Sequence, residues 1–191
     1  MKIGLFFGSF NPIHVGHLII ANYMVECSDM DELWLVVSPH NPLKERSTLA
    51  DDYDRLDMVT RSVEEHPKLM ASDVEFNLPK PSYTVDTLAY LTDEHPEHQF
   101  VLIMGGDNLG SLRKWKNYEV ILKHFEIYVY KRPSYDLGEL QNHPKIKIFE
   151  ETPLMEISST VIRKFVKEGK SIRYWVTEET RKVIKDGGLY L

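Results

Sequence analysis

A strand, a glycine turn and a helix follow one another at the start of the chain, and this order constrains the fold more than any other feature. Ile3 to Phe7 is an apolar run typical of a buried strand, and apolar residues recur near helical spacing from Val15 to Val25. Gly8 lies between the two segments, where it lets a ligand approach the backbone closely. The order predicts a ligand-binding loop between a strand and a helix.

The start of this helix carries two histidines. His14 and His17 lie three residues apart, so they share one face of the first helical turn, and Gly16 keeps that turn uncluttered. Ser9 adds a hydroxyl group in the preceding loop. Two imidazoles beside the free N–H groups and positive dipole end of a helix favour an anion, above all a phosphate. The alternative is a surface helix with two incidental histidines, and the glycine–serine turn argues against it.

Strand-like and helix-like segments alternate along the rest of the chain. Strands are predicted over 2–7, 33–38, 70–74, 100–104, 125–131 and 146–149, and helices over 14–27, 50–65, 83–95, 108–112, 118–124, 159–167 and 178–186. This alternation predicts an α/β fold, a Rossmann-like three-layer αβα sandwich with a mostly parallel sheet. Ligands bind such sheets at the carboxyl ends of the strands.

Composition sets bounds on the class of protein. With 191 residues, 42% of them hydrophobic, and no linker or repeat, we expect a single domain over 1–191. No apolar run reaches the ~20 residues that span a bilayer, and no signal peptide is visible, so we expect a cytoplasmic protein without a membrane partner. The net charge of −6 argues against broad nucleic-acid binding. The single cysteine, Cys27, excludes an internal disulfide and is expected to be buried.

A second candidate phosphate site follows near the carboxyl end of the chain, in the sequence Ile157-Ser158-Ser159-Thr160-Val161-Ile162-Arg163. Ser158 or Ser159 can cap the helix that begins there, and the cap leaves N–H groups facing an anion. Arg163 lies one turn further on and can reach the same anion with two parallel hydrogen bonds. The alternative is an ordinary capped surface helix.

Two further loops follow predicted strands. Lys44 lies in the proline-rich loop Pro39–Lys44 and offers an ammonium group to a phosphate, although a loop lysine is usually solvated. Gly105 and Gly106 permit a tight turn after the fourth strand. Asp107 either caps the following helix or accepts hydrogen bonds from ribose hydroxyls.

Two further segments carry aromatic and hydroxyl groups. Tyr83 and Thr84 open a predicted helix, where Thr84 offers a hydroxyl and the first amides are free. Trp115 is an aromatic plate between Lys114 and Lys116. Each of these features alone is more often structural.

Two histidine patterns are not expected to bind a metal ion. In His95-Pro96-Glu97-His98 the proline breaks any helix that would align the histidines. The segment Glu64-Glu65-His66 is typical of a solvated helix end. We therefore predict no metal ligands in the protein itself.

Residues 8–17 resemble the G-[ST]-F-[DN]-P-x-H-x-G-H signature of the HxGH nucleotidyltransferase superfamily, with Asn11 where many members have aspartate. Residues 157–163 are similar to its I-S-S-T-x-[IV]-R motif, which holds the β- and γ-phosphates of a nucleoside triphosphate. The loop ending at Lys44 resembles the P-x-x-P-x-[HK] loop. The two segments with aromatic and hydroxyl groups, together with Arg132-Pro133, resemble the acceptor-binding segments of nicotinate mononucleotide adenylyltransferases, in which an indole stacks on the pyridine ring and a threonine holds the carboxylate.

The resemblance implies transfer of the adenylyl group of ATP to nicotinate mononucleotide, with nicotinate adenine dinucleotide and pyrophosphate as products in NAD biosynthesis. It implies that Mg²⁺ arrives bound to ATP. The implied residues are, for catalysis, His14, His17, Lys44 and Arg163; for the nucleotide, Gly8, Ser9, Phe10, Gly105, Asp107, Ile157, Ser158 and Ser159; and for the acceptor, Tyr83, Thr84, Trp115 and Arg132. The sequence leaves a homo-oligomer open.

Other functions remain as alternatives. Within the superfamily, the acceptor could be pantetheine phosphate or nicotinamide mononucleotide, or the donor could carry a cytidylyl group. A nucleotide-binding sensor without catalysis would not need the triphosphate motifs. A dinucleotide-dependent oxidoreductase is disfavoured because G-x-G-x-x-G is missing after the first strand.

Overall fold

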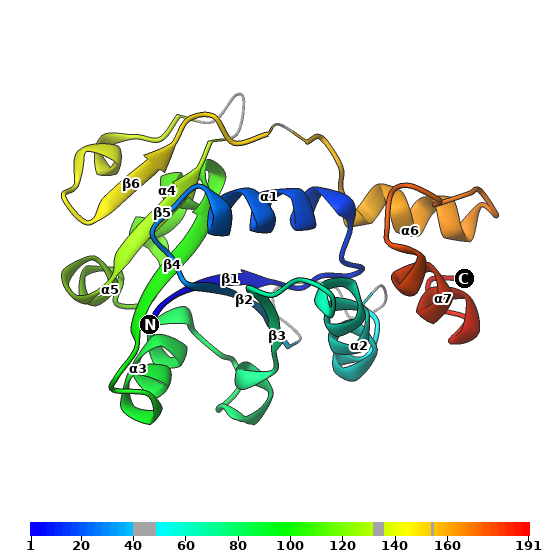
Figure 1. Ribbon diagram of the computed structural model, residues 1–191, viewed down its shortest axis with the longest axis horizontal. Helices are drawn as coiled ribbons and strands as arrows, with labels where there is room; N and C mark the ends of the chain where they lie inside the picture. The colour runs from blue at the N-terminus through cyan, green and yellow to red at the C-terminus, as the bar shows by residue number, and fades with distance from the viewer. Residues whose placement is uncertain (40–48, 132–135, 154) are drawn as a thin grey trace.

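The computed structural model describes residues 1–39, 49–131, 136–153 and 155–191. In this part of the chain, six strands form one sheet in the order β3-β2-β1-β4-β5-β6, and every neighbouring pair is parallel (Figure 1). The strands are β1 (Lys2–Gly8), β2 (Glu32–Val37), β3 (Leu69–Ser72), β4 (Gln99–Gly105), β5 (Glu126–Tyr130) and β6 (Ile146–Phe149). The mostly parallel sheet predicted from the alternation of segments is confirmed.

The strand order reverses its direction beside β1. The chain runs outward from β1 through β2 to β3 and then returns to place β4 on the other side of β1. The loops that leave β1 and β4 at their carboxyl ends therefore lead to opposite faces of the sheet, and parallel sheets bind ligands at such a point. Gly8 ends β1 and Gly105 ends β4, so both predicted glycine turns lie at this point.

Helices cover both faces of the sheet, as Figure 1 shows for α1 and α3. The helices are α1 (Val15–Glu26), α2 (Asp52–Val63), α3 (Thr84–Glu94), α4 (Gly106–Ser111), α5 (Tyr118–His124), α6 (Ser159–Lys167) and α7 (Glu178–Asp186), with short 3₁₀ helices η2 (Val74–Asn77), η3 (Leu112–Lys114) and η4 (Glu139–Asn142). Neighbouring residues of one strand serve opposite layers: Leu35 packs in the core under α1 and α2, and Val36 packs in the core under α3. The period of two along each strand thus builds two cores from one sheet.

The predicted helix limits agree with the structure to within two residues in every case, and those of α5, α6 and α7 coincide with it. The 3₁₀ helices were not predicted, because they are too short to show a hydrophobic period. The expectation that Cys27 is buried is wrong, because this residue caps the end of α1 and is exposed. Helical spacing predicts that Cys27 lies near the apolar face of the helix. The helix ends at Glu26, however, so the helical spacing does not apply to Cys27.

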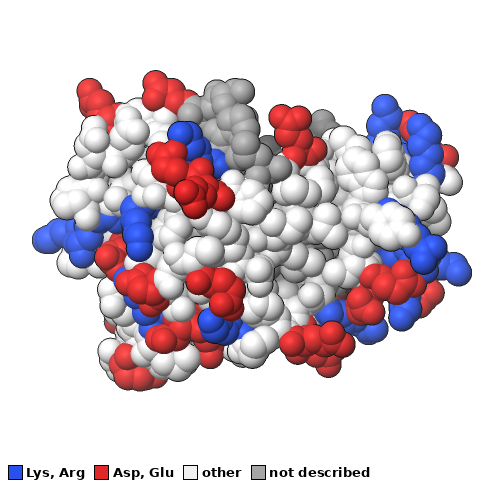
Figure 2. Space-filling view, turned by 45° about the horizontal axis from the view of Figure 1, so that its top comes forward, with Lys and Arg blue, Asp and Glu red and all other residues white. Residues whose placement is uncertain are grey.

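Acidic and basic side chains are interspersed around the rim of the face seen in Figure 2, and the middle of that face carries few charged groups. The net charge of −6 is therefore not gathered into one acidic patch on this face. Among the described residues, none of the helices is long and apolar enough to cross a bilayer.

Candidate active site

The two histidines after β1 form a stacked pair at the start of α1. His14 is the N-cap of this helix, and its Nδ1 accepts a hydrogen bond from the backbone N–H of His17 at 3.3 Å. The two rings lie 3.7 Å apart between centroids and 15° from parallel. A Cβ at Gly16 would lie 3.1 Å from His14 Nδ1, so the glycine leaves the room that this ring occupies. The HxGH spacing therefore packs both imidazoles against the helix start.

Phe10 supports this pair from the loop side. Its ring meets the ring of His17 edge-on at 5.1 Å, and its side chain is only 1% exposed. A Cβ at Gly8 would lie 2.8 Å from the Phe10 ring, so the glycine permits the ring to close over the end of β1. Because the ring is buried, only the backbone of Phe10 could contact a nucleotide.

The second predicted phosphate motif, residues 157–163, contacts this same loop. Ser159 donates a hydrogen bond from Oγ to the backbone carbonyl of Pro12 at 2.9 Å, and Arg163 donates from Nη1 to the carbonyl of Asn11 at 2.8 Å. Ser158 is the N-cap of α6, where its Oγ accepts from the N–H of Val161. The structure thus brings together the two predicted motifs from opposite ends of the chain.

Ile157 precedes this cap and lies beside the start of α1, within 3.6 Å of the position that a Cβ on Gly16 would take. Its side chain is half-buried. The residue therefore fills the space between the two helix starts, one of which carries His14 and the other Ser158.

A buried arginine that sequence reasoning missed holds the loops after β1 and β2 together. Arg55 of α2 is fully buried, and its Nη1 donates to the carbonyls of Ser9 at 2.6 Å and Ser38 at 2.8 Å. Its Nε donates to the carbonyl of Ala50 at 3.1 Å. The only sequence signal was an arginine on the polar side of an amphipathic helix, which usually indicates a solvated residue.

Asn11 was left without a chemical role by the sequence, and the structure gives it a structural one. Its Oδ1 accepts hydrogen bonds from the Tyr190 hydroxyl at 2.7 Å and from the N–H of Ala50 at 3.1 Å. Burial raises the pKa of Tyr190 well above its usual range, so this hydroxyl stays protonated and donates. Tyr190, near the carboxyl end of the chain, thereby contacts the loop between β1 and α1.

Asp107 lies in the first turn of α4, directly beyond the end of β4. A Cβ at Gly105 would come within 2.4 Å of Asp107 Oδ1, so the carboxylate folds back over the end of the strand, where only a glycine leaves room. Because β4 is the neighbour of β1, this carboxylate and the histidine pair follow adjacent strands at one edge of the sheet.

The three predicted acceptor residues described by the structure line one cavity of about 450 Å³. Tyr83 is the N-cap of α3, Thr84 is its first residue, and Trp115 follows η3. Phe7 and Ser38, at the ends of β1 and β2, line the same cavity. The cavity therefore opens at the carboxyl edge of the sheet, as predicted for a ligand site.

The same cavity holds a carboxyl group that sequence reasoning missed. Glu75 of η2 is buried, and its Oε1 accepts a hydrogen bond from the hydroxyl of Thr87 at 2.8 Å. Burial raises the pKa of Glu75, and hydrogen bonds from the hydroxyls of Ser38, Thr87 and Ser82 act in the opposite direction. A lone glutamate between apolar residues gave no sign in the sequence that it would face a ligand cavity.

Two predicted site residues, Lys44 and Arg132, lie outside the described residues. Lys116, one of the lysines beside Trp115, forms an ion pair with Asp86 of α3 at 2.8 Å and lies 4.4 Å from the centre of the Tyr83 ring. It therefore joins the two segments that line the cavity.

Comparison with known proteins assigns this arrangement to a family. Residues 5–165 match the model of the cytidylyltransferase-like family. The chain is 56% identical over 184 residues to a probable nicotinate-nucleotide adenylyltransferase of Cytophaga hutchinsonii, with 96% of this chain and 95% of that protein covered. It is 55% identical to the protein of the same name from Flavobacterium psychrophilum, with 100% and 99% covered. The chain belongs to the nicotinate-nucleotide adenylyltransferase family.

Solved structures agree with this nicotinate-nucleotide adenylyltransferase fold. Plasmodium falciparum nicotinic acid mononucleotide adenylyltransferase complexed with NaAD superposes with a TM-score of 0.83, and 99% of this chain and 97% of that chain are covered. The sequence identity is only 22%, so this superposition shows that the two proteins share a fold and no more. The family resemblance expected from the two motifs is confirmed.

Proposed function

We propose that this chain transfers the adenylyl group of ATP to nicotinate mononucleotide and releases pyrophosphate. The relatives that match it over nearly their whole length carry the name of this activity. The observation that carries the proposal is one continuous edge of the sheet that presents a phosphate-type site and an aromatic, donor-bearing cavity. The histidine pair and the start of α6 form the phosphate-type site. Tyr83, Thr84 and Trp115 line the cavity.

The two halves of the site are mechanically joined, which supports a reaction between ligands held in each. Phe7 lines the cavity, and the next residue, Gly8, begins the phosphate loop. Arg55 donates to Ser9 in that loop and to Ser38 in the cavity wall. A single buried guanidinium thus fixes the spacing between the halves, and fixed spacing is what a transfer between two bound substrates requires.

The reaction needs positioning and charge neutralisation more than proton transfer. An oxygen of the acceptor phosphate attacks the α-phosphorus of ATP, the bond from that phosphorus to the α–β bridging oxygen breaks, and pyrophosphate leaves with the electron pair. A phosphate monoester with a second pKa near ~6 is already mostly ionised at neutral pH, so no general base is required. His14 and His17 stabilise charge on the α-phosphate, and Ser158, Ser159 and Arg163 hold the leaving phosphates. Lys44 contributes a further positive charge.

On the acceptor side, Trp115 stacks on the pyridine ring. The carboxylate of nicotinate accepts hydrogen bonds from Thr84 and the amides at the start of α3, and Tyr83 and Arg132 complete the acceptor set. The position of Thr84 as the first residue of α3 supports this role, because the first N–H groups of a helix have no partner within the helix. On the nucleotide side, Gly8, Ser9, Phe10, Gly105, Asp107 and Ile157 surround ATP.

Magnesium enters as the complex with ATP. The groups at the described phosphate site are imidazoles, hydroxyls and a guanidinium, and Mg²⁺ prefers carboxylate, water and phosphate oxygens. These protein groups therefore suit the phosphate oxygens, and the triphosphate and water supply the ligands of Mg²⁺.

A pyrophosphate-release assay tests the proposal. ATP and CTP are each combined with nicotinate mononucleotide, nicotinamide mononucleotide and pantetheine phosphate, with Mg²⁺ present throughout. We expect turnover with ATP and nicotinate mononucleotide, and a mass-spectrometric product of nicotinate adenine dinucleotide. Binding of ATP without turnover on any pyridine mononucleotide would instead indicate a sensor, and faster turnover with CTP would overturn the choice of donor.

A further inference from the structure

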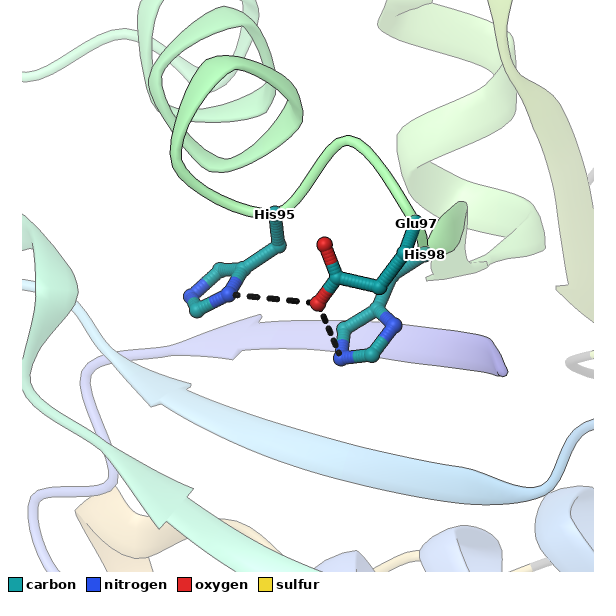
Figure 3. Close-up of side chains that lie close together, drawn as sticks. All are labelled: His95, Glu97 and His98. Atoms are coloured by element: carbon teal, nitrogen blue, oxygen red, sulfur yellow. Dashed lines mark ion pairs between the residues drawn. The ribbon is translucent and has the colours of Figure 1, made fainter.

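A histidine–glutamate–histidine cluster lies in the turn between α3 and β4, away from the candidate active site (Figure 3). His95 is the C-cap of α3, and β4 begins at Gln99, so His95, Glu97 and His98 are three of the four residues in the turn. This turn leads into the amino end of β4, whereas the candidate active site lies at the carboxyl ends of the strands. The cluster therefore belongs to the opposite edge of the sheet.

Pro96 ends the helix, as the sequence predicted, but the turn that follows brings the two imidazoles to the same carboxylate. The N–H of His98 donates to the carbonyl of His95 at 3.0 Å and closes the turn. His95 Nδ1 lies 3.9 Å and His98 Nε2 lies 3.3 Å from Glu97 Oε1. The reason for excluding a metal ion was the loss of helical alignment, and a closed turn removes that reason.

These distances fit a small tetrahedral ion. All three ligand atoms lie within 4.8 Å of one another. Ligand atoms bound tetrahedrally to zinc at about 2.0–2.1 Å stand roughly 3.4 Å apart, so one edge of the tetrahedron is already formed. Glu97 is 61% exposed and can rotate to shorten the longer separation.

Aromatic packing holds the two rings in place before any ion binds. The His95 ring meets Trp34 edge-on at 6.1 Å, and the His98 ring meets Phe100 at 6.3 Å. The two imidazoles lie 14° from parallel. Nδ1 of His98 is buried and has no hydrogen-bond partner among the described residues, so packing and Glu97 fix this ring. Rings held this way lose little freedom when a metal ion binds, which favours affinity.

The charges around the turn are mixed, because Lys2 of β1 pairs with Gln99 directly after it. Between Lys80 and Arg113 the sequence contains no lysine or arginine, and Asp93 and Glu94 immediately precede His95. Two imidazole nitrogens and one carboxylate oxygen are typical ligands of zinc and neighbouring transition metals, whereas Mg²⁺ and Ca²⁺ select oxygen ligands alone.

We propose that His95, Glu97 and His98 bind one divalent late first-row transition-metal ion, with Zn²⁺ preferred and water in the fourth position. The ion joins the end of α3 to the start of β4. Because Tyr83 and Thr84 begin the same helix at the acceptor cavity, the ion steadies the far end of a helix that shapes that cavity. Its role is structural, since no ligand atom reaches the phosphate loop.

The test uses metal-free, tag-free protein with Trp34 as the reporter. In a Trp115→Phe, Trp175→Phe background, Trp34 is the one remaining tryptophan of the three in the sequence. We expect Co²⁺ to quench its emission with one equivalent, Zn²⁺ to reverse the quenching, and Zn²⁺ to raise the melting temperature. His95→Ala and His98→Ala should each weaken Zn²⁺ binding by ~100-fold or more, because loss of a ligand exceeds the usual effect of losing a group that only supports one.

His124→Ala is the matched control, because His124 is an exposed histidine outside the cluster. It should keep the quenching and the rise in melting temperature. Glu97→Gln leaves the packed rings in place and should still lower affinity, so it serves if the histidine variants fold poorly. Unchanged Zn²⁺ affinity in His95→Ala, His98→Ala and Glu97→Gln would overturn the proposal. So would a lack of Trp34 quenching by Co²⁺ in the Trp115→Phe, Trp175→Phe protein with the cluster intact.

Discussion

Arg163 donates a hydrogen bond to the backbone carbonyl of Asn11 at 2.8 Å, across 152 positions of the sequence. The hydroxyl of Ser159 makes a second contact of the same kind, to the carbonyl of Pro12 at 2.9 Å. The start of α6 is thereby held against the loop that leads into α1. Two helix N-termini border one loop, and their positive dipole ends favour the same anionic ligand.

We expect His17→Ala to lower turnover by ~10²-fold or more, the scale seen when one preorganised charge-stabilising donor is lost. His17 lies against His14 and Phe10, so its ring is held in place before substrate binds. Initial rates at saturating substrates measure the effect. Turnover unchanged by this substitution would refute a phosphate role for the pair.

His14 needs a variant that separates chemistry from stability, because its Nδ1 also caps α1. Loss of an N-cap costs about 1 kcal/mol, so His14→Ala should lower both turnover and the melting temperature. His14→Asn keeps a capping oxygen and removes the imidazole. We expect it to retain the melting temperature and still lose turnover, and the reverse pattern would show that His14 acts only as a cap.

Arg163→Ala should weaken the binding of ATP and pyrophosphate far more than that of the acceptor. Arg163→Lys should restore only part of it, because an ammonium group cannot reproduce the two parallel hydrogen bonds of a guanidinium. Isothermal titration with each ligand separates the effects. The neighbouring Lys164, 69% exposed in its side chain, gives the control Lys164→Ala, which should bind ATP normally. Full rescue by lysine, or a defect limited to the acceptor, would contradict this role.

We expect a preference for nicotinate over nicotinamide mononucleotide of at least ~10²-fold, since donors left without their charged partner cost a few kcal/mol. Trp115→Ala should weaken both acceptors, because stacking does not read the substituent on the ring. Thr84→Val should narrow the preference between them. Kinetics with the two mononucleotides measure both changes.

Tyr90→Ala provides the control for these variants. Tyr90 is an exposed aromatic residue of the same helix as Thr84 and does not line the cavity. Its substitution should leave both acceptors unaffected. Equal efficiency of the parent protein with the two mononucleotides would indicate a dual-specificity enzyme and would refute the carboxylate-binding role of Thr84.

Glu75 makes stability depend on pH in a defined direction. Burial raises the pKa of this carboxyl, so the folded protein holds the proton more tightly than the unfolded chain does. Its contribution to stability is therefore largest in acid and is lost as the pH rises through the folded pKa. Glu75→Gln stays neutral, so its melting temperature relative to the parent protein should be higher at pH 8 than at pH 5.

The exposed Glu119→Gln provides the baseline for this comparison. It should shift the melting temperature equally at both pH values. A Glu75→Gln effect that is the same at pH 5 and pH 8, or that grows in acid, would contradict the raised pKa.

Local patterns were enough to predict the layers of the fold and the two helix starts at His14 and Ser158. The apolar runs of β1 and β4 and the amphipathic spacing of α6 depend on nearest neighbours in the sequence, and the helix start at Ser158 needs only its own hydroxyl. Such features can be predicted without the tertiary structure, because a few consecutive residues determine the burial pattern and the cap.

Residues whose role depends on distant partners could not be found this way. Arg55 resembles a solvated helix residue until three carbonyls from separate loops surround its guanidinium. Glu75 of η2 lines the same cavity as Tyr83 and Thr84 at the start of α3. Cys27 is exposed because it follows the end of α1, which is at Glu26. The sequence also cannot show that the turn from His95 to His98 brings two imidazoles to one carboxylate, because that depends on how the chain folds after Pro96.

The sequence by itself determined the alternation of strands and helices, the glycine turn with its two histidines and the capped helix with its arginine, since these are properties of short segments. Only the tertiary structure decided that the two motifs share one loop and that Arg55 joins this loop to Ser38 in the wall of the cavity. It also decided that Glu97 lies between two imidazoles. The reason is physical: hydrogen bonds and burial depend on separation in space, and strand order in the sheet sets that separation independently of distance along the chain.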